Sequence, residues 1–153
     1  MAVTRPEAIA VGGSRLQVPA YFPSISSLKT AIEPIAYAQI LKALSPVSSQ
    51  FLISAYDIAC ADVDTKASFR SILTEALEAG TTVLMDSGNY ESYWRGTNAS
   101  WDAGAFHSVL RESPFSFAFG FDEQNPPQDF DAHVGLVVES WSRDQVAAGN
   151  CAV

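Results

Sequence analysis

Short apolar runs that end in a carboxylate are the feature that most constrains this chain. Residues 83–85 are apolar, Asp86 follows them directly, and Gly88 lies in the polar turn beyond. A short continuous apolar run is typical of a buried strand, and the turn marks its end. Glycine in that turn allows backbone angles that a side chain would forbid. The stretch therefore predicts a buried strand with a carboxylate at its carboxyl end.

The same design occurs twice more along the chain. Residues 51–56 form an apolar run directly before Asp57, and residues 117–121 form another directly before Asp122. The carboxyl ends of parallel strands lie along one edge of a sheet, where doubly wound sheets and (β/α)8 barrels both have their sites. We therefore expect these two aspartates to share one rim with Asp86.

Segments with helical spacing separate the apolar runs. Asp64 and Asp102 are the expected N-caps of two helices, and Gly80 is the expected C′ residue of the first. An extended segment with two prolines, residues 16–25, is the expected first strand. The helices are predicted over residues 34–44, 64–79, 102–113 and 130–148.

The alternation of strand and helix predicts an α/β fold with a parallel sheet. Four successive β/α units are half of a (β/α)8 barrel, which is the architecture we expect over residues 16–153, as a single domain after a loose lead-in over residues 1–15. Half a barrel leaves unpaired backbone along its first and last strands. We therefore expect a homo-oligomer, a partner chain that supplies the carboxy-terminal half, or a longer protein of which this chain is a fragment.

The composition excludes several classes of function. The net charge of −8 and the scattering of the nine basic residues argue against unaided binding to a phosphate backbone. Cys60 and Cys151 lie far apart, which argues against a disulfide framework or a thiolate zinc site. We expect no metal and no cofactor. The absence of a signal-peptide pattern and of a long apolar stretch predicts a cytoplasmic protein without a membrane span.

Two motifs follow two successive predicted strands. They are Asp86-Ser87-Gly88-Asn89-Tyr90-Glu91 and Phe121-Asp122-Glu123-Gln124-Asn125-Pro126. In this order they resemble the amino-terminal half of the tRNA-guanine transglycosylase family, the queuine and archaeosine tRNA-ribosyltransferases. Members of that family carry D-S-G-G-[FY]-Q after one strand of a (β/α)8 barrel and F-D-E-C-x-P after the next. The resemblance covers roughly residues 16–141.

The resemblance implies a base-exchange site on tRNA, of the pentosyltransferase type, for guanine or a 7-deazaguanine. It implies that Asp86 binds the base and does acid or base catalysis, that Tyr90 stacks on the base, and that Asp122 reads its edge. A carboxylate can accept hydrogen bonds from adjacent N–H donors of such a base. The same motifs supply the remaining expected substrate-binding residues, Ser87, Gly88, Asn89 and Glu123.

The chain also departs from the family pattern. Asn89 stands in place of a glycine, Glu91 in place of a glutamine, and Gln124 in place of a cysteine, which implies an altered pocket floor or another base. The nucleophilic aspartate and the zinc site of the family lie in its carboxy-terminal half. We therefore assign only the base-binding side to this chain, and we expect tRNA binding only with a basic partner or a further segment.

Two other functions remain open at this stage. One is a non-catalytic nucleobase-binding or interaction module, and the other is an unrelated α/β hydrolase that uses Asp86 and Asp122. Other residues near the motifs are expected to have structural roles. We expect Asp57 and Glu123 to be solvated rim charges or caps, and Tyr93, Trp94 and Trp101 to serve local packing.

Overall fold

The structure is a computed structural model that describes residues 8–11, 14–17, 20–24, 34–96, 100–121 and 127–148. It confirms an α/β fold with a parallel, open sheet that alternates with helices. The elements are, in chain order, β1 (Ala8–Val11), β2 (Ser14–Gln17), α2 (Pro34–Leu44), β3 (Gln50–Ser54), α3 (Ala55–Cys60), α4 (Val63–Glu78), β4 (Thr82–Asp86), α5 (Asn89–Trp94), α6 (Ala103–Glu112), β5 (Phe117–Ala118) and α7 (Phe130–Ala148).

The sheet has the order β3-β4-β5, so its strands are neighbours in the order in which they occur in the chain. Leu52 pairs with Leu84, and Leu84 pairs with Phe117. On the other side of β3, the Leu52 N–H donates to the Pro23 carbonyl at 2.9 Å, and Ser24 forms a parallel bridge to Leu52. The predicted first extended segment thus lies beside β3, although only one bridge joins them.

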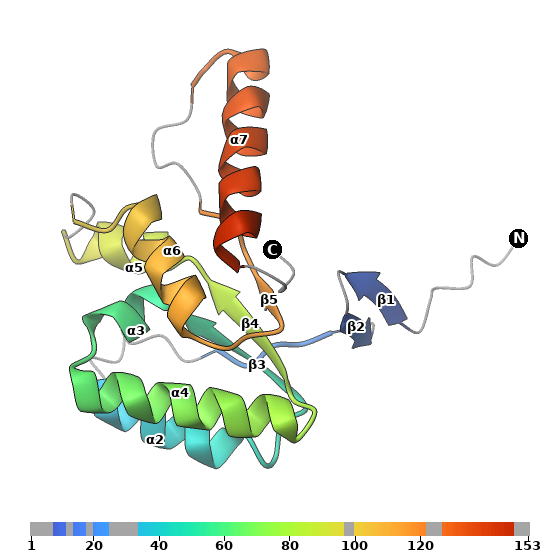
Figure 1. Ribbon diagram of the computed structural model, residues 1–153, viewed down its shortest axis with the longest axis vertical. Helices are drawn as coiled ribbons and strands as arrows, with labels where there is room; N and C mark the ends of the chain where they lie inside the picture. Colours follow the sequence, from blue (N-terminus) through green and yellow to red (C-terminus); the bar gives the residue numbers. More distant parts are fainter. Residues whose placement is uncertain are drawn as a thin grey trace, which may run out of the picture.

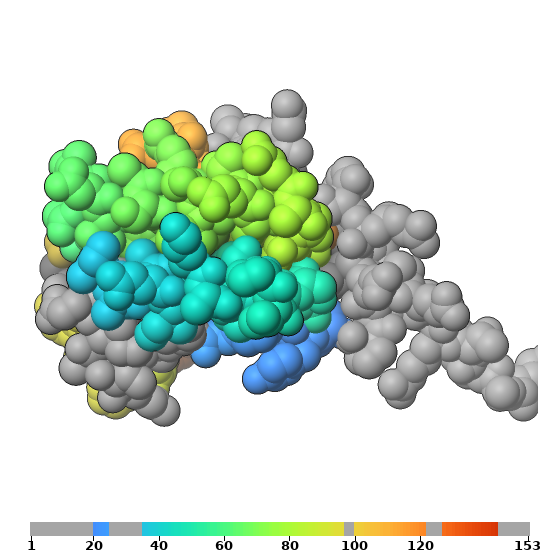
Figure 2. All heavy atoms as spheres, turned by 90° about the horizontal axis from the view of Figure 1, so that it is seen from below, coloured from blue at the N-terminus to red at the C-terminus, as the bar shows by residue number. Residues whose placement is uncertain are grey.

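Helices α2 and α4 lie side by side and cover one face of the sheet (Figure 1), and Figure 2 shows them together from below. Alternate strand residues are fully buried on that face, and the largest buried side chains of the two helices meet them. Tyr37 of α2 contacts Phe69 of α4 edge-to-face, with ring centroids 5.7 Å apart. The strand residues of this core are Phe51, Ile53, Val83 and Met85.

The opposite face of the sheet is not covered in the same way. Leu52 and Leu84 point to it and are only partly buried, so burial alternates along β3 and β4. Continuous apolar runs such as these are typical of strands that are covered on both faces. The difference arises because α2 and α4 pack on one face only. Apolar side chains on the other face do not by themselves require a helix to pack there.

The caps of the helices test the local predictions. Asp102 caps α6 as predicted, since its Oδ1 accepts from the Ala105 N–H at 2.8 Å. Gly80 follows the C-cap of α4 with a positive φ of 84°, also as predicted. The predicted N-cap Asp64 was wrong: Asp62 is the N-cap, and its Oδ1 accepts from the Thr65 N–H at 2.8 Å. Both aspartates precede the same apolar face, so spacing alone did not separate them.

The lead-in predicted over residues 1–15 contains more regular structure than expected. Strands β1 and β2 form an antiparallel pair in which Ala8 is opposite Gln17, and this pair lies to one side of the α/β body (Figure 1). The two residues between the strands are both glycine, a sequence typical of tight hairpin turns. Among the described residues, no helix combines the length and the apolar character needed to cross a membrane.

Candidate functional site

The carboxyl ends of β3 and β4 meet at one rim, because Ser54 pairs with Asp86 in the parallel register. Each strand passes almost directly into a short helix, β3 into α3 and β4 into α5. The sequence predicted a strand up to Tyr56, but β3 ends at Ser54 and Asp57 lies in the first turn of α3. The rim is therefore built from two strand ends and the first turns of two helices.

The turn after β4 requires glycine at position 88, as the sequence predicted. Gly88 is the N-cap of α5 and has left-handed backbone angles, with a φ of 73°. A Cβ at this position would lie 2.3 Å from the Cβ of Tyr56 and 2.7 Å from the Oγ of Ser54. A side chain here is thus disfavoured twice, by conformation and by space. The close approach holds the turn against the start of α3.

Asp86 lies at the end of β4 and is partly exposed. Its Oδ2 accepts a hydrogen bond from the Gly88 N–H at 3.2 Å, which stabilises the turn. The same carboxylate is close enough to Glu91 to raise the pKa of that group. Asp86 therefore supports the turn and at the same time contributes negative charge to the rim.

Three carboxylates gather at this rim, on three different elements. Burial raises the pKa of Glu91 above its ordinary value, and the negative charges of Asp86 and Asp57 raise it further, while its own backbone and Arg95 act in the opposite direction. Asp57 is 4% exposed, so the expectation of a solvated rim charge was wrong. Negative charges that are close together and partly desolvated favour proton uptake by one of them.

Tyr37 of α2 belongs to the same cluster. Its side chain is fully buried, and burial raises the pKa of its hydroxyl, as do the negative charges of Asp57, Glu91 and Asp86, while the backbone of Ser54 acts in the opposite direction. Its Oη, the Oγ of Ser54 and the Oε2 of Glu91 are buried and have no hydrogen-bond partner among the described residues. Buried polar atoms normally have a partner, so leaving these three atoms without one carries a desolvation cost.

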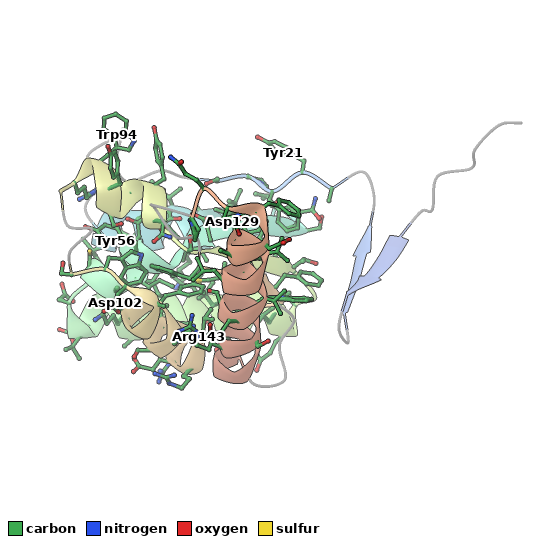
Figure 3. The ribbon with its side chains drawn as sticks, turned by 90° about the horizontal axis from the view of Figure 1, so that it is seen from above. Tyr21, Tyr56, Trp94, Asp102, Asp129 and Arg143 are labelled. Atoms are coloured by element: carbon green, nitrogen blue, oxygen red, sulfur yellow. The ribbon has the colours of Figure 1, made fainter. Side chains whose placement is uncertain are left out.

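The aromatic residues of this region fall into two groups. Trp101 is buried, its Nε1–H donates to the Ser87 carbonyl at 3.0 Å, and it packs edge-to-face on Tyr56, which confirms its role in local packing. By contrast, Tyr93 is 56% exposed and Trp94 is 61% exposed, and their rings pack edge-to-face on each other, with centroids 5.6 Å apart. Figure 3 shows Trp94 pointing away from the body and Tyr56 lying within it.

Tyr90 is also exposed, at 58%, and its ring contacts that of Trp94 at 6.0 Å between centroids. Tyr90, Tyr93 and Trp94 lie three and four positions apart on α5, which places them on one side of the helix. Glu91 follows Tyr90 directly in the chain and lies at the rim. An exposed aromatic ring and an acidic rim are thus presented by the first turn of one helix.

The remaining predicted site residues differ in what they can contact. The side chains of Ser87 and Asn89 are buried, and the Asn89 carbonyl accepts from the Ser92 hydroxyl at 2.9 Å, so both support the turn from within. Asp122 and Glu123 lie outside the described residues, and their predicted place beside Asp86 stays a prediction. Glu91 and Tyr37 are the rim residues that the site prediction missed; the available signal for Glu91 was its place in the stretch 86–91 after the strand.

A groove lies away from the rim, between α3, α4 and α6. This groove of about 500 Å³ is lined by apolar side chains such as Ile58 and Val109, with Lys66 and Arg70 along α4. The Arg70 Nε–H donates to the Glu112 carbonyl at 2.8 Å, so this cation contacts the carboxyl end of α6. No group of at least three histidine, cysteine or acidic side chains in the described ranges is arranged to hold a metal ion.

Comparison with known protein families, with curated protein sequences and with solved structures found no match to this chain.

Proposed function

We propose that this chain is a tRNA-guanine transglycosylase-like protein that contributes the nucleobase-binding side of a base-exchange site, with guanine or a 7-deazaguanine as its ligand. The observation that carries the proposal is the position of Asp86 and Glu91 at one rim, with the exposed residue Tyr90 directly before Glu91 on α5. A guanine-like base presents adjacent N–H donors along one edge and a flat π face. The rim offers carboxylate acceptors for the first and an aromatic surface for the second.

The acidic rim also limits the class of ligand. The negative charges of Asp86 and Asp57 raise the pKa of Glu91, so this rim favours a proton or a cationic donor. A neutral base with several N–H groups, or a deazaguanine that carries an ammonium group, satisfies that preference, whereas a phosphate or a carboxylate would be repelled. With a net charge of −8, binding of tRNA to this protein requires a basic partner or a further basic segment.

The architecture that we propose is half of a (β/α)8 barrel. Its support is the order of the parallel strands, in which residues 20–24, β3, β4 and β5 are neighbours in chain order. Doubly wound sheets reverse this order at a switch point, whereas barrels keep it throughout. The carboxylate rim at the carboxyl ends of the strands then corresponds to the face on which barrel enzymes bind their substrates.

Within this proposal Asp86 is the residue for acid or base catalysis at the base, as the resemblance implies. Glu91 joins it, because a carboxyl group whose pKa is raised can exchange a proton nearer to neutral pH. Attack on C1′ of the ribose needs a nucleophile, and we assign that step to no residue of this chain. The proposed contribution is recognition of the base and movement of its proton.

Calorimetry with guanine and with 7-deazaguanines tests the proposal. We expect the native chain to bind at least one of these bases, and Asp86→Asn to bind it at least about tenfold more weakly, since charge-assisted hydrogen bonds are worth about 1.5–3 kcal/mol. Asp64→Asn is the matched control, because Asp64 is exposed in the first turn of α4 and lies outside the rim. No binding by a folded native chain would remove base recognition from consideration.

A second candidate is a non-catalytic nucleobase-binding module. The observation that favours it is that the rim supplies carboxylate acceptors, Asp86 and Glu91, while no nucleophile for the sugar is assigned to this chain. Exchange of radiolabelled guanine into tRNA separates the two functions, with the chain assayed alone and with lysate from its source. Binding without exchange in either assay would favour the module, and exchange that depends on Asp86 would favour the enzyme.

A further inference from the structure

The groove away from the acidic rim has a regular wall on each side. Helices α4 and α6 line it with residues spaced three and four positions apart, which fall on one side of a helix. On α4 these residues are Val63, Lys66, Ala67 and Arg70, and on α6 the same spacing runs from Ala105 to Glu112. Helix α3 lies between the two at one end of the groove (Figure 1). Three helices thus enclose one elongated hollow.

Short side chains keep this hollow unfilled. Ala59, Ala67 and Ala105 each come from a different helix, and all three line the groove. The two buried residues of the lining, Ile58 and Val109, are apolar and are 5% and 7% exposed. The volume of about 500 Å³ lies within the range of roughly 300–1,000 Å³ that is usual for small-molecule pockets. The groove therefore has the size and the apolar floor of a small-molecule site.

The groove is short as well as narrow. The α4 wall extends from Val63 to Arg70, which is about 10 Å along a helix. At the Arg70 end, the Nε–H donates to the Glu112 carbonyl at 2.8 Å and joins α4 to the end of α6. At the Val63 end, α3 stops shortly before α4 begins. A short elongated molecule fits between these limits, whereas a long helix of a partner protein would have to pass over the bond at Arg70.

Basic side chains surround the groove at the end away from α3. Lys66 is exposed, and Arg70 lies one turn further along α4. The Arg111 Nη2 donates to the hydroxyl of Ser108, a lining residue, at 3.1 Å. None of these three cations forms an ion pair within the described ranges, and Glu112 is the carboxylate among the described lining residues. In a chain with a net charge of −8, such a local excess of cations favours an anionic ligand.

Two further acidic residues lie near the start of α4. The carboxylate of Asp62 accepts from the Thr65 N–H at 2.8 Å and is thereby held at the cap of the helix. Asp64 is two positions from Lys66, and residues two apart on a helix do not face each other. Both aspartates belong to the end of the groove that Ile58 and Ala59 make apolar, so the cationic end stays available.

We propose that the groove binds a small amphiphilic carboxylate, which consists of an unbranched alkyl chain and one anionic head group. The alkyl chain lies along the apolar end next to α3, and the carboxylate lies at Lys66 and Arg70. This site is separate from the proposed base-binding rim and does not depend on it.

The length of the groove selects the probe. An extended chain advances about 1.2 Å per bond, as the protein backbone does, so about 10 Å holds roughly eight carbon atoms. Octanoate is therefore the test ligand. Each buried methylene group should strengthen binding about fourfold, so affinity should rise steeply from butanoate through hexanoate to octanoate. Beyond octanoate the gain per methylene should fall, because the added carbons extend outside the groove.

Nuclear magnetic resonance of the ¹⁵N-labelled full chain tests the proposal and locates the site. Octanoate at millimolar concentration should shift the amide signals of Ala67 and Ala105, and should leave that of Gly88 at the rim unchanged. Octanol and octylamine carry the same alkyl chain with a neutral and a cationic head group. Octanoate should bind most tightly of the three and octylamine least tightly.

Two substitutions test the head group. Lys66→Gln should weaken octanoate binding by up to about fivefold, the usual limit for an exposed charge pair, and should leave octanol binding unchanged. Glu112→Gln should change octanoate binding in the opposite direction. Lys42→Gln is the matched control, because Lys42 is exposed in the last turn of α2 and lies outside the groove.

A third substitution tests the apolar part. Ala67→Phe should weaken octanoate binding at least about tenfold, because the ring takes the place of several methylene groups. Ala43→Phe is the control at an exposed alanine of α2. Both alanines are exposed, so both variants should fold, which circular dichroism checks.

Three results would overturn the proposal. The first is the absence of shifts at Ala67 and Ala105 when octanoate is added to the native chain. The second is equal binding of octanoate, octanol and octylamine, which would mean an apolar surface without a preference for an anion. The third is a shift of the same amides when the ligand-free chain is diluted, which would mean that a second copy of the chain occupies the groove.

Discussion

Gly88 lies so close to Tyr56 that a Cβ on the glycine would be 2.3 Å from the Cβ of the tyrosine. This contact joins the turn after β4 to the first turn of α3, two segments that are more than thirty residues apart in the chain. It therefore couples the two halves of the acidic rim. A change at this glycine should disturb the rim and the fold together.

Gly88→Ala should reduce the free energy of unfolding by about 2–5 kcal/mol. Left-handed backbone angles cost a residue with a side chain about 1–2 kcal/mol, and forcing an atom into a packed site adds about 1–3 kcal/mol. Gly80→Ala is the matched control: it has a similar φ of 84° but no atom within 4 Å of its added Cβ. Urea denaturation should therefore show a smaller loss for it, of about 1–2 kcal/mol. Equal losses for the two variants would contradict the packing argument.

Glu91 should make the stability of the fold depend on pH in mildly acidic solution. Burial, and then the charges of Asp86 and Asp57, raise the pKa of Glu91 in the folded state above its ordinary value of 4.5. The folded chain thus takes up this proton at a higher pH than the unfolded chain does. The associated stability is fully present below the unfolded-state pKa and is lost as the pH rises through the raised folded-state pKa.

Glu91→Gln should consequently be more stable than the native chain at neutral pH, and this advantage should shrink as the pH falls towards 4.5. Urea denaturation at several pH values between these limits measures the difference. Glu78→Gln removes the same charge from an exposed position at the end of α4 and serves as the control. A difference between Glu91→Gln and the native chain that stays constant with pH would argue against a raised pKa.

Tyr37→Phe should stabilise the chain, by about 1 kcal/mol. The Tyr37 hydroxyl is buried and makes no hydrogen bond of good geometry among the described residues, although the backbone of Ser54 lies near enough to lower its pKa. Removing this poorly satisfied group relieves part of a desolvation cost of about 1–3 kcal/mol. Tyr21→Phe, at a position that is 77% exposed, should change stability little. Thermal unfolding measures both. A clear loss of stability in Tyr37→Phe would mean that the hydroxyl makes a stabilising hydrogen bond in the folded chain.

Tyr90→Ala should weaken guanine binding by about 1–3 kcal/mol, the usual contribution of stacking on one base, which is roughly a 5–150-fold change in affinity. Tyr90→Phe keeps the ring and should bind like the native chain. Tyr93→Ala removes an equally exposed ring from the same helix, 56% exposed against 58%, and should change affinity less than about twofold. Equal losses from both alanine variants would point to a general effect on α5 and not to stacking.

Local signals predicted most of the elements. Pro34 begins α2, Asp102 caps α6 and Gly80 ends α4, each as its sequence context indicates. These features depend on the backbone energetics of a few neighbouring residues, and those residues can be read directly from the sequence. The two errors are also local. The predicted N-cap Asp64 lies two residues after the actual N-cap Asp62, and the predicted strand end at Tyr56 lies two residues after the actual end of β3 at Ser54.

The candidate site was predictable only in part. Asp86 and Gly88 were identifiable because the strand end and the turn are one continuous stretch. Glu91 and Tyr37 were not identifiable. Their pKa values depend on burial and on the carboxylates that the tertiary structure brings near them. The buried position of Asp57 likewise follows from the packing of α3, which no pattern in residues 51–57 indicates.

Local sequence patterns predicted the alternation of β3, β4 and β5 with α2, α4, α6 and α7, the caps at Asp102 and Gly80, and the glycine that the turn at position 88 requires, but not β1, β2, α3 or α5. Each of these is decided by local conformational preference and by short-range hydrogen bonds. Only the tertiary structure decided that Asp57, Asp86 and Glu91 share one rim with Tyr37, and that one face of the sheet is packed while the other stays partly open. The physical reason is that burial and charge interactions depend on distances in space, which arise from parallel strand pairing and from the packing of helices on a single face.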